Sequence, residues 1–384
     1  MEDVPMELVV DIICRLPAKS ILRFRRVSKT WKCLIDCSDF VNLQLKKSIE
    51  TRTHLRLIIR RNSVLFSVDL DPFDCAVELV HPLMCYGSRI RIWGSCNGIL
   101  CICNVADDIA LWNPSTRKYR ILPSLPPERR SDDVFRFSVD AYGFGYDSVH
   151  DDFKLLKISQ FIRLNPMDIE SVVKVFSLRK FCWIPIQSMT YSLRYSSKMG
   201  VFVNGALHWV VSHQNLGMGV ADLVVAFVLA TDKFKEIPLP EFTDTKCEIH
   251  VHVLGGYLCL LANYERARLE VWVMKEYGVQ ESWTKLLTVG SQVDFDGSIK
   301  SVKLLSYSKT GREVLLLQNR KRLIWYDLQN QKVRDAEIGG LPHSFEAETL
   351  VESLIPIDAY REKPENNLED KREDFLSEGF KLVL

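Results

Sequence analysis

The sequence predicts an α+β protein, in which a small N-terminal unit of three helices precedes a long all-β domain. The first observation is a run of apolar residues at helical spacing between Val4 and Ile35. The second is a change of period at His54, after which apolar runs of four to eight residues alternate with turn clusters. The third is a bulky aromatic residue that recurs every 45 to 64 residues through this second part.

The first predicted helix begins after Pro5 and ends at Leu16. Proline suits the first helical turn, because its missing N–H would have no partner there. Pro17 predicts the end of the helix, because the residue before a proline is pushed out of the α region. The spacing of the apolar residues places them in one stripe along the helix: Leu8, Val9, Ile12, Ile13 and Leu16.

Two shorter helices are predicted after Pro17. One restarts at Ala18 with an apolar face that includes Ile21, Leu22 and Phe24. Ser28 is a predicted N-cap for the other, which carries Trp31. A unit of about thirty residues is too small to bury this much apolar surface alone, and it has no metal or disulfide pattern. We therefore expect it to bind a protein partner.

This unit resembles the F-box, although the Leu-Pro that opens the family motif is Val4-Pro5 here. F-box proteins bind a Skp-type adaptor, which joins a cullin and a RING protein in an SCF ubiquitin ligase. The resemblance therefore implies adaptor binding by the residues that match the motif: Pro5, Leu8, Val9, Ile12, Leu16, Pro17, Leu22, Val27, Lys29 and Trp31.

Composition excludes several classes of protein. A formal net charge of +1 gives no overall field that would favour nucleic acid or an acidic membrane. The longest apolar runs fall short of the ~20 residues of a membrane span, and no secretory signal follows Met1, so we expect a cytoplasmic or nuclear protein. Cys96, Cys101 and Cys103 lack zinc-site spacing, and we expect neither a metal nor a cofactor.

After one more predicted helix, at Ser38–Lys47, the chain is predicted to consist of short strands. They are rich in Val, Ile, Phe and Trp, and no long helical period interrupts them. The clearest are Leu55–Ile59, Ile99–Cys103, Phe153–Ile158, Ala206–Val211, Tyr257–Ala262, Leu269–Met274 and Val314–Leu317.

The recurring aromatic residue predicts a kelch-like propeller of six blades. Each anchor is followed seven residues later by a second bulky residue, or eleven residues later in the fifth pair. Intervals near 50 residues suit four-stranded blades, and a late strand at Thr349–Ile355 would close the ring against the first. A β-sandwich with accidental spacing is the alternative. The pairs are Phe66/Phe73, Trp112/Tyr119, Phe176/Trp183, Phe227/Phe234, Trp272/Trp283 and Tyr326/Val333.

The β domain resembles the plant F-box-associated interaction domain. The resemblance rests on the Trp112–Arg117 and Gly143–Asp147 motifs and on Gly205–Trp209. Ser67–Leu70 and Met274–Tyr277 further resemble the constitutive-expresser-of-pathogenesis-related-genes type, which restrains plant immunity by leading nucleotide-binding leucine-rich-repeat receptors to degradation. The S-locus F-box proteins of pollen, which recruit ribonucleases, are near relatives. The expected domains are 1–36 (F-box), 37–53 (helical linker), 54–358 (substrate-binding propeller) and 359–384 (charged flexible tail).

The expected function is that of a non-catalytic subunit that selects a protein for ubiquitination; a propeller enzyme or a metabolite-binding module is the competing class. Gly94–Gly98 matches a cysteine nucleophile elbow, but a strand rather than a helix is predicted after it. Seven basic residues between Arg15 and Lys32 favour an acidic protein partner over nucleic acid. Candidate substrate contacts are three predicted loops: Leu125–Asp133, Gln160–Glu170 and His213–Gly219.

Overall fold

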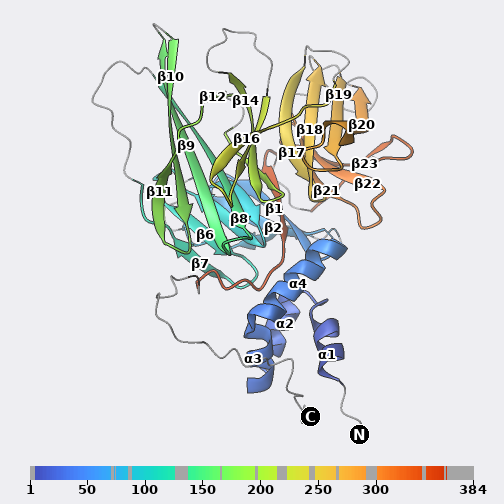
Figure 1. The fold of residues 1–384 in the computed structure, drawn as a ribbon. Helices are drawn as coiled ribbons and strands as arrows, with labels where there is room; N and C mark the ends of the chain where they lie inside the picture. Colours follow the sequence, from blue (N-terminus) through green and yellow to red (C-terminus); the bar gives the residue numbers. More distant parts are fainter. Residues whose placement is uncertain are drawn as a thin grey trace.

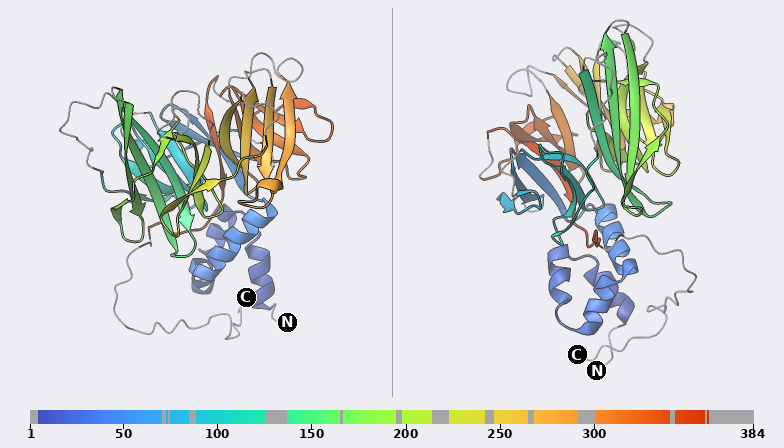
Figure 2. Two further views of the ribbon diagram at one scale, coloured as in Figure 1. Left: turned by 45° about the horizontal axis from the view of Figure 1, so that its top comes forward. Right: turned by 90° about the vertical axis from the view of Figure 1, so that its left-hand side faces the viewer.

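The computed structural model shows a cluster of helices beneath a ring of antiparallel sheets (Figure 1). In both views of Figure 2 the helices lie on the same face of the ring. None of the described helices is long and apolar enough to cross a membrane. The structure describes residues 5–70, 73, 75–84, 89–125, 137–164, 167–194, 198–213, 223–241, 247–264, 268–290, 301–339, 343–358 and 360.

Four helices form the N-terminal unit: α1 (Met6–Ile13), α2 (Ala18–Phe24), α3 (Lys29–Asp36) and α4 (Ser38–Thr51). The predicted N-cap is confirmed, because the Ser28 side chain accepts a hydrogen bond from the Trp31 N–H. The predicted end of the first helix was wrong. It ends at Ile13, and the N–H groups of Arg15 and Leu16 bond to carbonyls three residues back, which tightens the last turn before Pro17.

The β domain contains six sheets, which we number as blades in chain order. All pairings within them are antiparallel, and in each blade the strands run outward from the ring axis in the order given. Blade 1 is β25 (Glu346–Val351), β1 (Leu55–Arg61), β2 (Val64–Asp69) and β3 (Val77–Leu79); blade 2 is β4 (Arg91–Cys96), β5 (Ile99–Cys103), β6 (Ile109–Asn113) and β7 (Lys118–Ile121); blade 3 is β8 (Phe137–Asp147), β9 (Asp152–Leu164), β10 (Met167–Ser177) and β11 (Cys182–Ile186).

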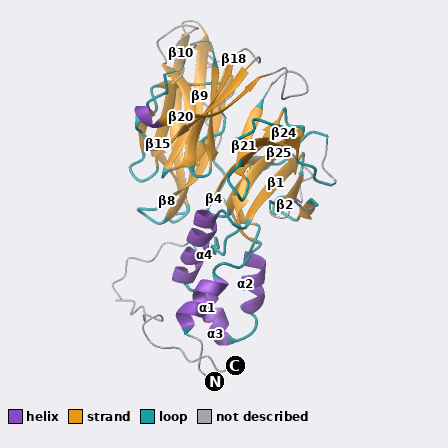
Figure 3. Ribbon diagram, turned by 90° about the vertical axis from the view of Figure 1, so that its right-hand side faces the viewer, coloured by secondary structure: helices purple, strands orange, loops and turns teal. Residues whose placement is uncertain are grey.

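The other three blades follow the same plan, which Figure 3 shows in orange above the helices. Blade 4 alone has two short strands, β12 and β13, on the inner edge of β14. Blade 4 is β12 (Tyr191–Leu193), β13 (Val201–Val203), β14 (Ala206–His213), β15 (Leu223–Val228) and β16 (Lys233–Ile237); blade 5 is β17 (Glu248–Leu254), β18 (Tyr257–Tyr264), β19 (Arg268–Met274) and β20 (Trp283–Gly290); blade 6 is β21 (Val302–Tyr307), β22 (Glu313–Gln318), β23 (Arg322–Asp327) and β24 (Val333–Asp335).

The six-bladed propeller is confirmed, and so is closure of the ring by a late strand. Neighbouring innermost strands contact one another around the circle, from β4 through β8, β13, β17 and β21 to β25. β25 pairs with β1, which joins the last of the described strands to the first blade. This strand spans Glu346–Val351 rather than the predicted Thr349–Ile355, and the chain then leaves the sheet towards the helices.

All six aromatic anchors lie on equivalent strands, the one next to the outermost strand of each blade, as the period predicts. In four blades the partner seven residues later sits directly opposite on the outer strand, as Trp112 does with Tyr119. The residues of the other two pairs do not face each other. Phe66 faces Glu78, because Phe73 lies before β3, and Trp272 faces Lys285, because a 3₁₀ turn, η2 (Gln280–Ser282), and a register shift intervene.

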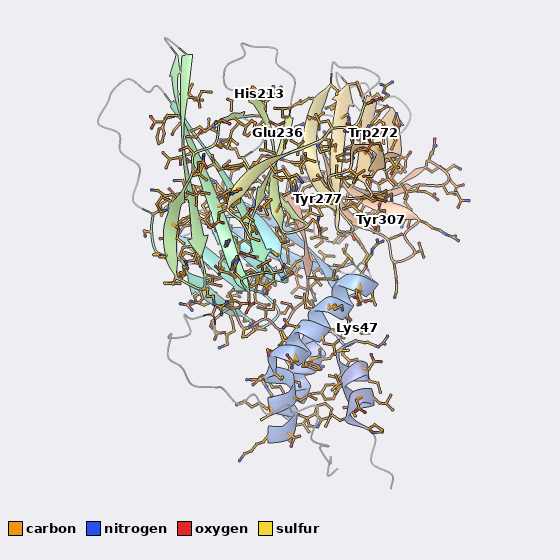
Figure 4. The ribbon with its side chains drawn as sticks, viewed as in Figure 1. Lys47, His213, Glu236, Trp272, Tyr277 and Tyr307 are labelled. Carbon is orange, nitrogen blue, oxygen red and sulfur yellow. The ribbon has the colours of Figure 1, made fainter. Side chains whose placement is uncertain are left out.

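The stretched intervals between aromatic anchors predict two surface insertions, at Lys275–Glu281 and Leu122–Asp140. The first is an exposed connection between β19 and β20. Tyr277 (Figure 4) reaches blade 4, where its hydroxyl lies 2.7 Å from Nε2 of the buried His208. Burial lowers the pKa of His208 to about 4, so this histidine is neutral and the contact holds two blades together. Of the second predicted insertion, Leu122–Asp140, residues 126–136 lie outside the described residues, and β8 already begins at Phe137.

A segment after β25, residues 352–358, which we call the C-terminal strap, joins the helices to the ring. Buried Asn113, at the end of β6, donates to the carbonyls of Ser353 and Ile355 at 3.1 and 3.0 Å. Leu354, Ile355 and Ile357 belong to one apolar cluster that also includes Ile21 and Phe40 of the helices and Trp93 of blade 2. The two parts of the protein therefore share a core.

Glu352 makes the polar contact between the strap and the helices. Its buried carboxylate accepts a 3.0 Å hydrogen bond from the N–H of Ala18, the first residue of α2. The N-cap position of α2 is Pro17, which has no side chain that can cap the helix, so Glu352 supplies the cap from 334 residues away. Arg56 of β1 pairs with its other oxygen at 2.7 Å and neutralises the charge.

We predict that Glu352→Gln destabilises the protein by about 3 kcal/mol, because it removes the charge that holds Arg56 and caps α2 inside the shared core. Chemical denaturation measures the difference. Asp358→Asn is the control, since it removes a carboxylate from the same strap but from an exposed pair with Lys118, worth less than about 1 kcal/mol. Equal losses in the two variants would contradict the assignment.

Gly98 tests the docking of the strap separately. It has φ +79° in the turn after β4, and a Cβ there would lie 2.9 Å from the Val351 carbonyl and closer still to the Ser353 hydroxyl. Gly205 also follows an asparagine, at φ +73°, but nothing lies within 4 Å of its Cβ position. Alanine at either position meets the same backbone strain. Gly98→Ala should therefore cost about 2 kcal/mol more than Gly205→Ala in thermal unfolding.

Candidate functional site

The helical unit presents apolar side chains that its own packing leaves uncovered. Leu8 is 56% exposed, Ile12 61% and Val27 66%. Leu8 and Ile12 are four residues apart on α1, so they form one outward stripe. Ile13, on the opposite side of α1, is buried in the shared core. The single wide stripe predicted from the sequence is therefore divided into an outer and an inner half.

The ten residues of the F-box motif fall into two groups. The first group is exposed: Pro5, Leu8, Ile12, Pro17, Val27 and Lys29. The second group is half-buried and packs against the shared core: Val9, Leu16, Leu22 and Trp31. All ten lie between Pro5, the N-cap of α1, and the first turn of α3, before α4 begins.

Trp31 connects the two groups. It lines a shallow apolar cleft with Met6, Val9, Thr30 and Leu34. Phe24, at the end of α2 and 38% exposed, stacks on the Trp31 ring with centroids 5.6 Å apart. The sequence motif alone does not identify Met6, Phe24 or Leu34 as part of this surface. Phe24 could have been found from its place on the apolar face of the second predicted helix.

The basic run from Arg15 to Lys32 is partly neutralised by acidic residues that lie just outside it. Asp11 accepts hydrogen bonds from the Arg15 guanidinium, which hold the pKa of this carboxyl below its usual value. Asp36 pairs with Arg25 through both oxygens, at 2.5 and 2.7 Å. Five cations have no carboxylate partner within the described part of the chain and give the surface a basic rim: Lys19, Arg23, Arg26, Lys29 and Lys32.

The candidate cysteine nucleophile is a buried structural residue. Cys96 ends β4, and strand β5 follows the Asn97–Gly98 turn as predicted. Burial raises the pKa of its thiol, which disfavours the thiolate that such chemistry needs. No group of three metal-ligating side chains occurs among the described residues.

The innermost strands of the ring carry ionisable groups that neutralise one another. Lys303 of β21 lies 2.5 Å from a carboxylate oxygen of Glu348 on β25. Burial, together with the charges of Lys303 and His250, lowers the pKa of His252 to about 3. The imidazole of His252 is therefore neutral near pH 7, and the arrangement fits a structural contact between strands β17, β21 and β25.

Of the predicted substrate loops, the second was wrong. Residues 160–164 and 167–170 extend β9 and β10 in a long antiparallel hairpin, because alternating apolar residues continue the strand period. The Gln160 amide is buried and bonds to Ser171 and to the backbone of Tyr191 and Leu193, which ties this hairpin to blade 4. In the other two loops, residues 126–133 and 214–219 lie outside the described residues.

The charged tail predicted from residue 359 includes one residue that is packed. The ring of Tyr360 meets Phe153 edge to face at 5.4 Å, and its carbonyl accepts a hydrogen bond from Arg120. Residues 361–384 lie outside the described residues.

Two family models match the chain. Residues 1–43 match the F-box domain, and residues 56–357 match the F-box associated beta propeller domain. The first match covers the four helices up to the middle of α4, and the second covers all six blades and most of the C-terminal strap.

Curated relatives have the same extent as this chain. F-box protein CPR1 of Arabidopsis thaliana is 35% identical over the full length of both proteins. A second Arabidopsis thaliana relative, F-box protein At4g22390, is 34% identical over the full length of both. One solved structure that matches is an oligogalacturonate lyase in complex with manganese, with a TM-score of 0.40 and 8% identity. The match covers 72% of this chain and 71% of that one. A structure this distant does not inform the function. This chain therefore belongs to the F-box proteins that carry an F-box associated beta propeller domain.

Proposed function

We propose that this chain is the substrate-recognition subunit of an SCF-type E3 ubiquitin ligase, acting in the cytoplasm or the nucleus. The helices would dock on a Skp-type adaptor, and through it on the cullin and RING subunits. The propeller would recruit a protein for ubiquitination and proteasomal degradation. In this role the chain positions another protein and performs no chemistry itself.

The exposed apolar surface of the helices is the observation that supports this proposal most. Leu8 and Ile12 on α1, and Val27 in the turn between α2 and α3, are each more than half exposed in the free chain. Covering a side chain of this size stabilises a contact by about 1.5–3 kcal/mol. Apolar groups of this size, gathered on one small unit and rimmed by cations, are typical of a protein-binding surface.

We assign direct adaptor contacts to the exposed group of the motif and to Trp31. The Trp31 ring lines the apolar cleft and also packs against the shared core. It would therefore contact the adaptor and hold the helices together. Val9, Leu16 and Leu22 would position the helices rather than touch the adaptor.

For the recruited protein we propose a nucleotide-binding leucine-rich-repeat immune receptor. The support is the full-length similarity to F-box protein CPR1 together with the motifs at Ser67–Leu70 and Met274–Tyr277. Both motifs lie on the propeller, at the end of β2 and at the start of the β19–β20 connection, so they belong to the part that would select the substrate.

We predict that Leu8→Asp with Ile12→Asp weakens binding of a recombinant Skp-type adaptor at least ~100-fold, because two charges would be buried against an apolar partner surface. Isothermal titration calorimetry measures the affinity. The melting temperature should not change, since both side chains face solvent in the free chain.

The matched control places the same charges on the propeller. Val80 is 80% exposed and Val149 73%, so Val80→Asp with Val149→Asp adds two carboxylates without touching the helices. This control should bind the adaptor with unchanged affinity. Wild-type affinity in the Leu8 and Ile12 variant would contradict the adaptor-binding assignment.

The Leu8→Asp, Ile12→Asp variant can also be used as a substrate trap. Deleting residues 1–35 would remove Ile13, Cys14 and Ile21 from the core that they share with the ring, so a full-length variant is preferable. We expect the Leu8→Asp, Ile12→Asp chain to hold its substrate in plant cells without promoting degradation, because only the adaptor contact is lost. Affinity purification with mass spectrometry identifies that substrate. Recovery of an immune receptor would support the proposal, and recovery of a ribonuclease would favour the pollen role.

A further inference from the structure

Four arginines from three separate segments of the chain line one cavity of about 280 Å³. Arg60 and Arg61 come from the end of β1, Arg89 from the segment before β4, and Arg320 from the turn between β22 and β23. Glu346, at the start of β25, is the single carboxylate in the lining. With His343 neutral, the cavity therefore carries a formal charge of +3 in a chain whose total is +1.

This cavity lies on the face of the ring that points away from the helices. β1 follows α4 at Leu55 and ends at Arg61, and β25 starts at Glu346 and ends at the strap that holds α2. Both strands cross the ring from one face to the other, as the views in Figures 1 and 3 show. At ~3.3 Å per residue, the cavity is about 20 Å from the helix junction. It is open when an adaptor covers the helices.

Backbone hydrogen bonds between separate segments fix the walls of the cavity. The Ile90 N–H donates to the Asn62 carbonyl at 3.0 Å, which places Arg89 beside the turn that follows Arg61. The Phe345 N–H donates to the Arg320 carbonyl at 2.8 Å, which places Arg320 beside the start of β25. The four arginine backbones are thus held in place by paired strands and by these two bonds.

The arginines differ in what they bind within the chain. Arg60 and Arg320 both approach Glu346, at 2.5 and 3.5 Å. Burial alone would raise the pKa of Glu346, but the hydrogen bond from Arg60 and the surrounding cations hold it below its usual value, so the carboxylate is ionised. Arg61 and Arg89 are exposed, and no acidic group of the described residues pairs with either.

We propose that this cavity binds an acidic segment of the protein that the propeller recruits, with Arg61 and Arg89 donating to its carboxylate or phosphate oxygens. A guanidinium offers paired N–H donors that match such oxyanions. Because the positive charge is confined to one cavity, it fits a short acidic peptide better than the extended backbone of a nucleic acid. The identity of the occupant as a recruited protein rests on the proposed function; the oxyanion chemistry does not.

The test uses the full-length purified chain and an immobilised library of degenerate peptides. One central position is fixed in turn as phosphoserine, phosphothreonine, aspartate, glutamate or unmodified serine. We expect the acidic mixtures to be retained at least ~10-fold better than the serine mixture at low ionic strength, with the difference shrinking as salt is added. If only the phosphoserine and phosphothreonine mixtures are retained, the cavity accepts phosphate. If the aspartate and glutamate mixtures are retained as well, it also accepts carboxylate.

The Arg61→Ala, Arg89→Ala variant should lose at least ~10-fold in retention of the acidic mixtures, since it removes the two unpaired guanidinium groups. Lys233→Ala with Lys235→Ala is the matched control, because it removes the same charge from exposed positions on the outer strand of blade 4. Equal retention of serine and acidic mixtures, or equal losses in the two variants, would overturn the proposal. Tighter binding of inorganic phosphate than of any peptide mixture would also overturn it, in favour of a small anion.

Adaptor binding separates this inference from the proposed function. The Arg61→Ala, Arg89→Ala chain should bind the Skp-type adaptor with wild-type affinity, because the cavity and the helices lie on opposite faces of the ring. Selective peptide retention by a chain that fails to bind the adaptor would leave the cavity assigned and would refute the ligase role.

Discussion

The buried carboxylate of Glu352 is the contact on which the relation between the two parts of this protein depends. Two groups from distant parts of the chain converge on it, the first N–H of α2 and the guanidinium of Arg56 on β1. A buried charge is tolerated only when it is paired and hydrogen-bonded, so each partner requires the other two to be in place. The orientation of the helices is therefore coupled to correct closure of the first blade.

The fold could be predicted from the sequence because a propeller repeats. One aromatic residue marks an equivalent strand in every blade, so its period predicted the number of blades. The residue that follows it in the pair lies directly opposite only where the turn keeps a constant length. Phe73 and Trp283 depart from this arrangement because their turns differ, and a spacing rule contains no information about such differences.

The composition of the proposed adaptor-binding surface was also visible in the sequence, whereas the contacts that orient it were not. The motif marks which residues of α1 to α3 matter, yet it does not separate the outward Leu8 from the inward Ile13. That separation depends on where the ring sits, and it is fixed by contacts between residues 334 positions apart. The arginine cavity has the same origin, because its four side chains come from three distant segments and no local pattern joins them.

The position of β25 has a consequence for how the protein is made. The strand that completes the first blade, and the strap that caps α2, follow all the other described strands in the order of synthesis. A nascent chain can build blades 2 to 6 on the ribosome, but β1 lacks its inner neighbour and α2 lacks its cap until residues 346–357 have emerged. A transcript with a premature stop codon before this point would yield a chain that lacks the strap, so its helices would no longer be held against the ring. Such a product would expose the edge of β1 and the apolar face of the helices together, which are the features that chaperones and quality-control proteases recognise.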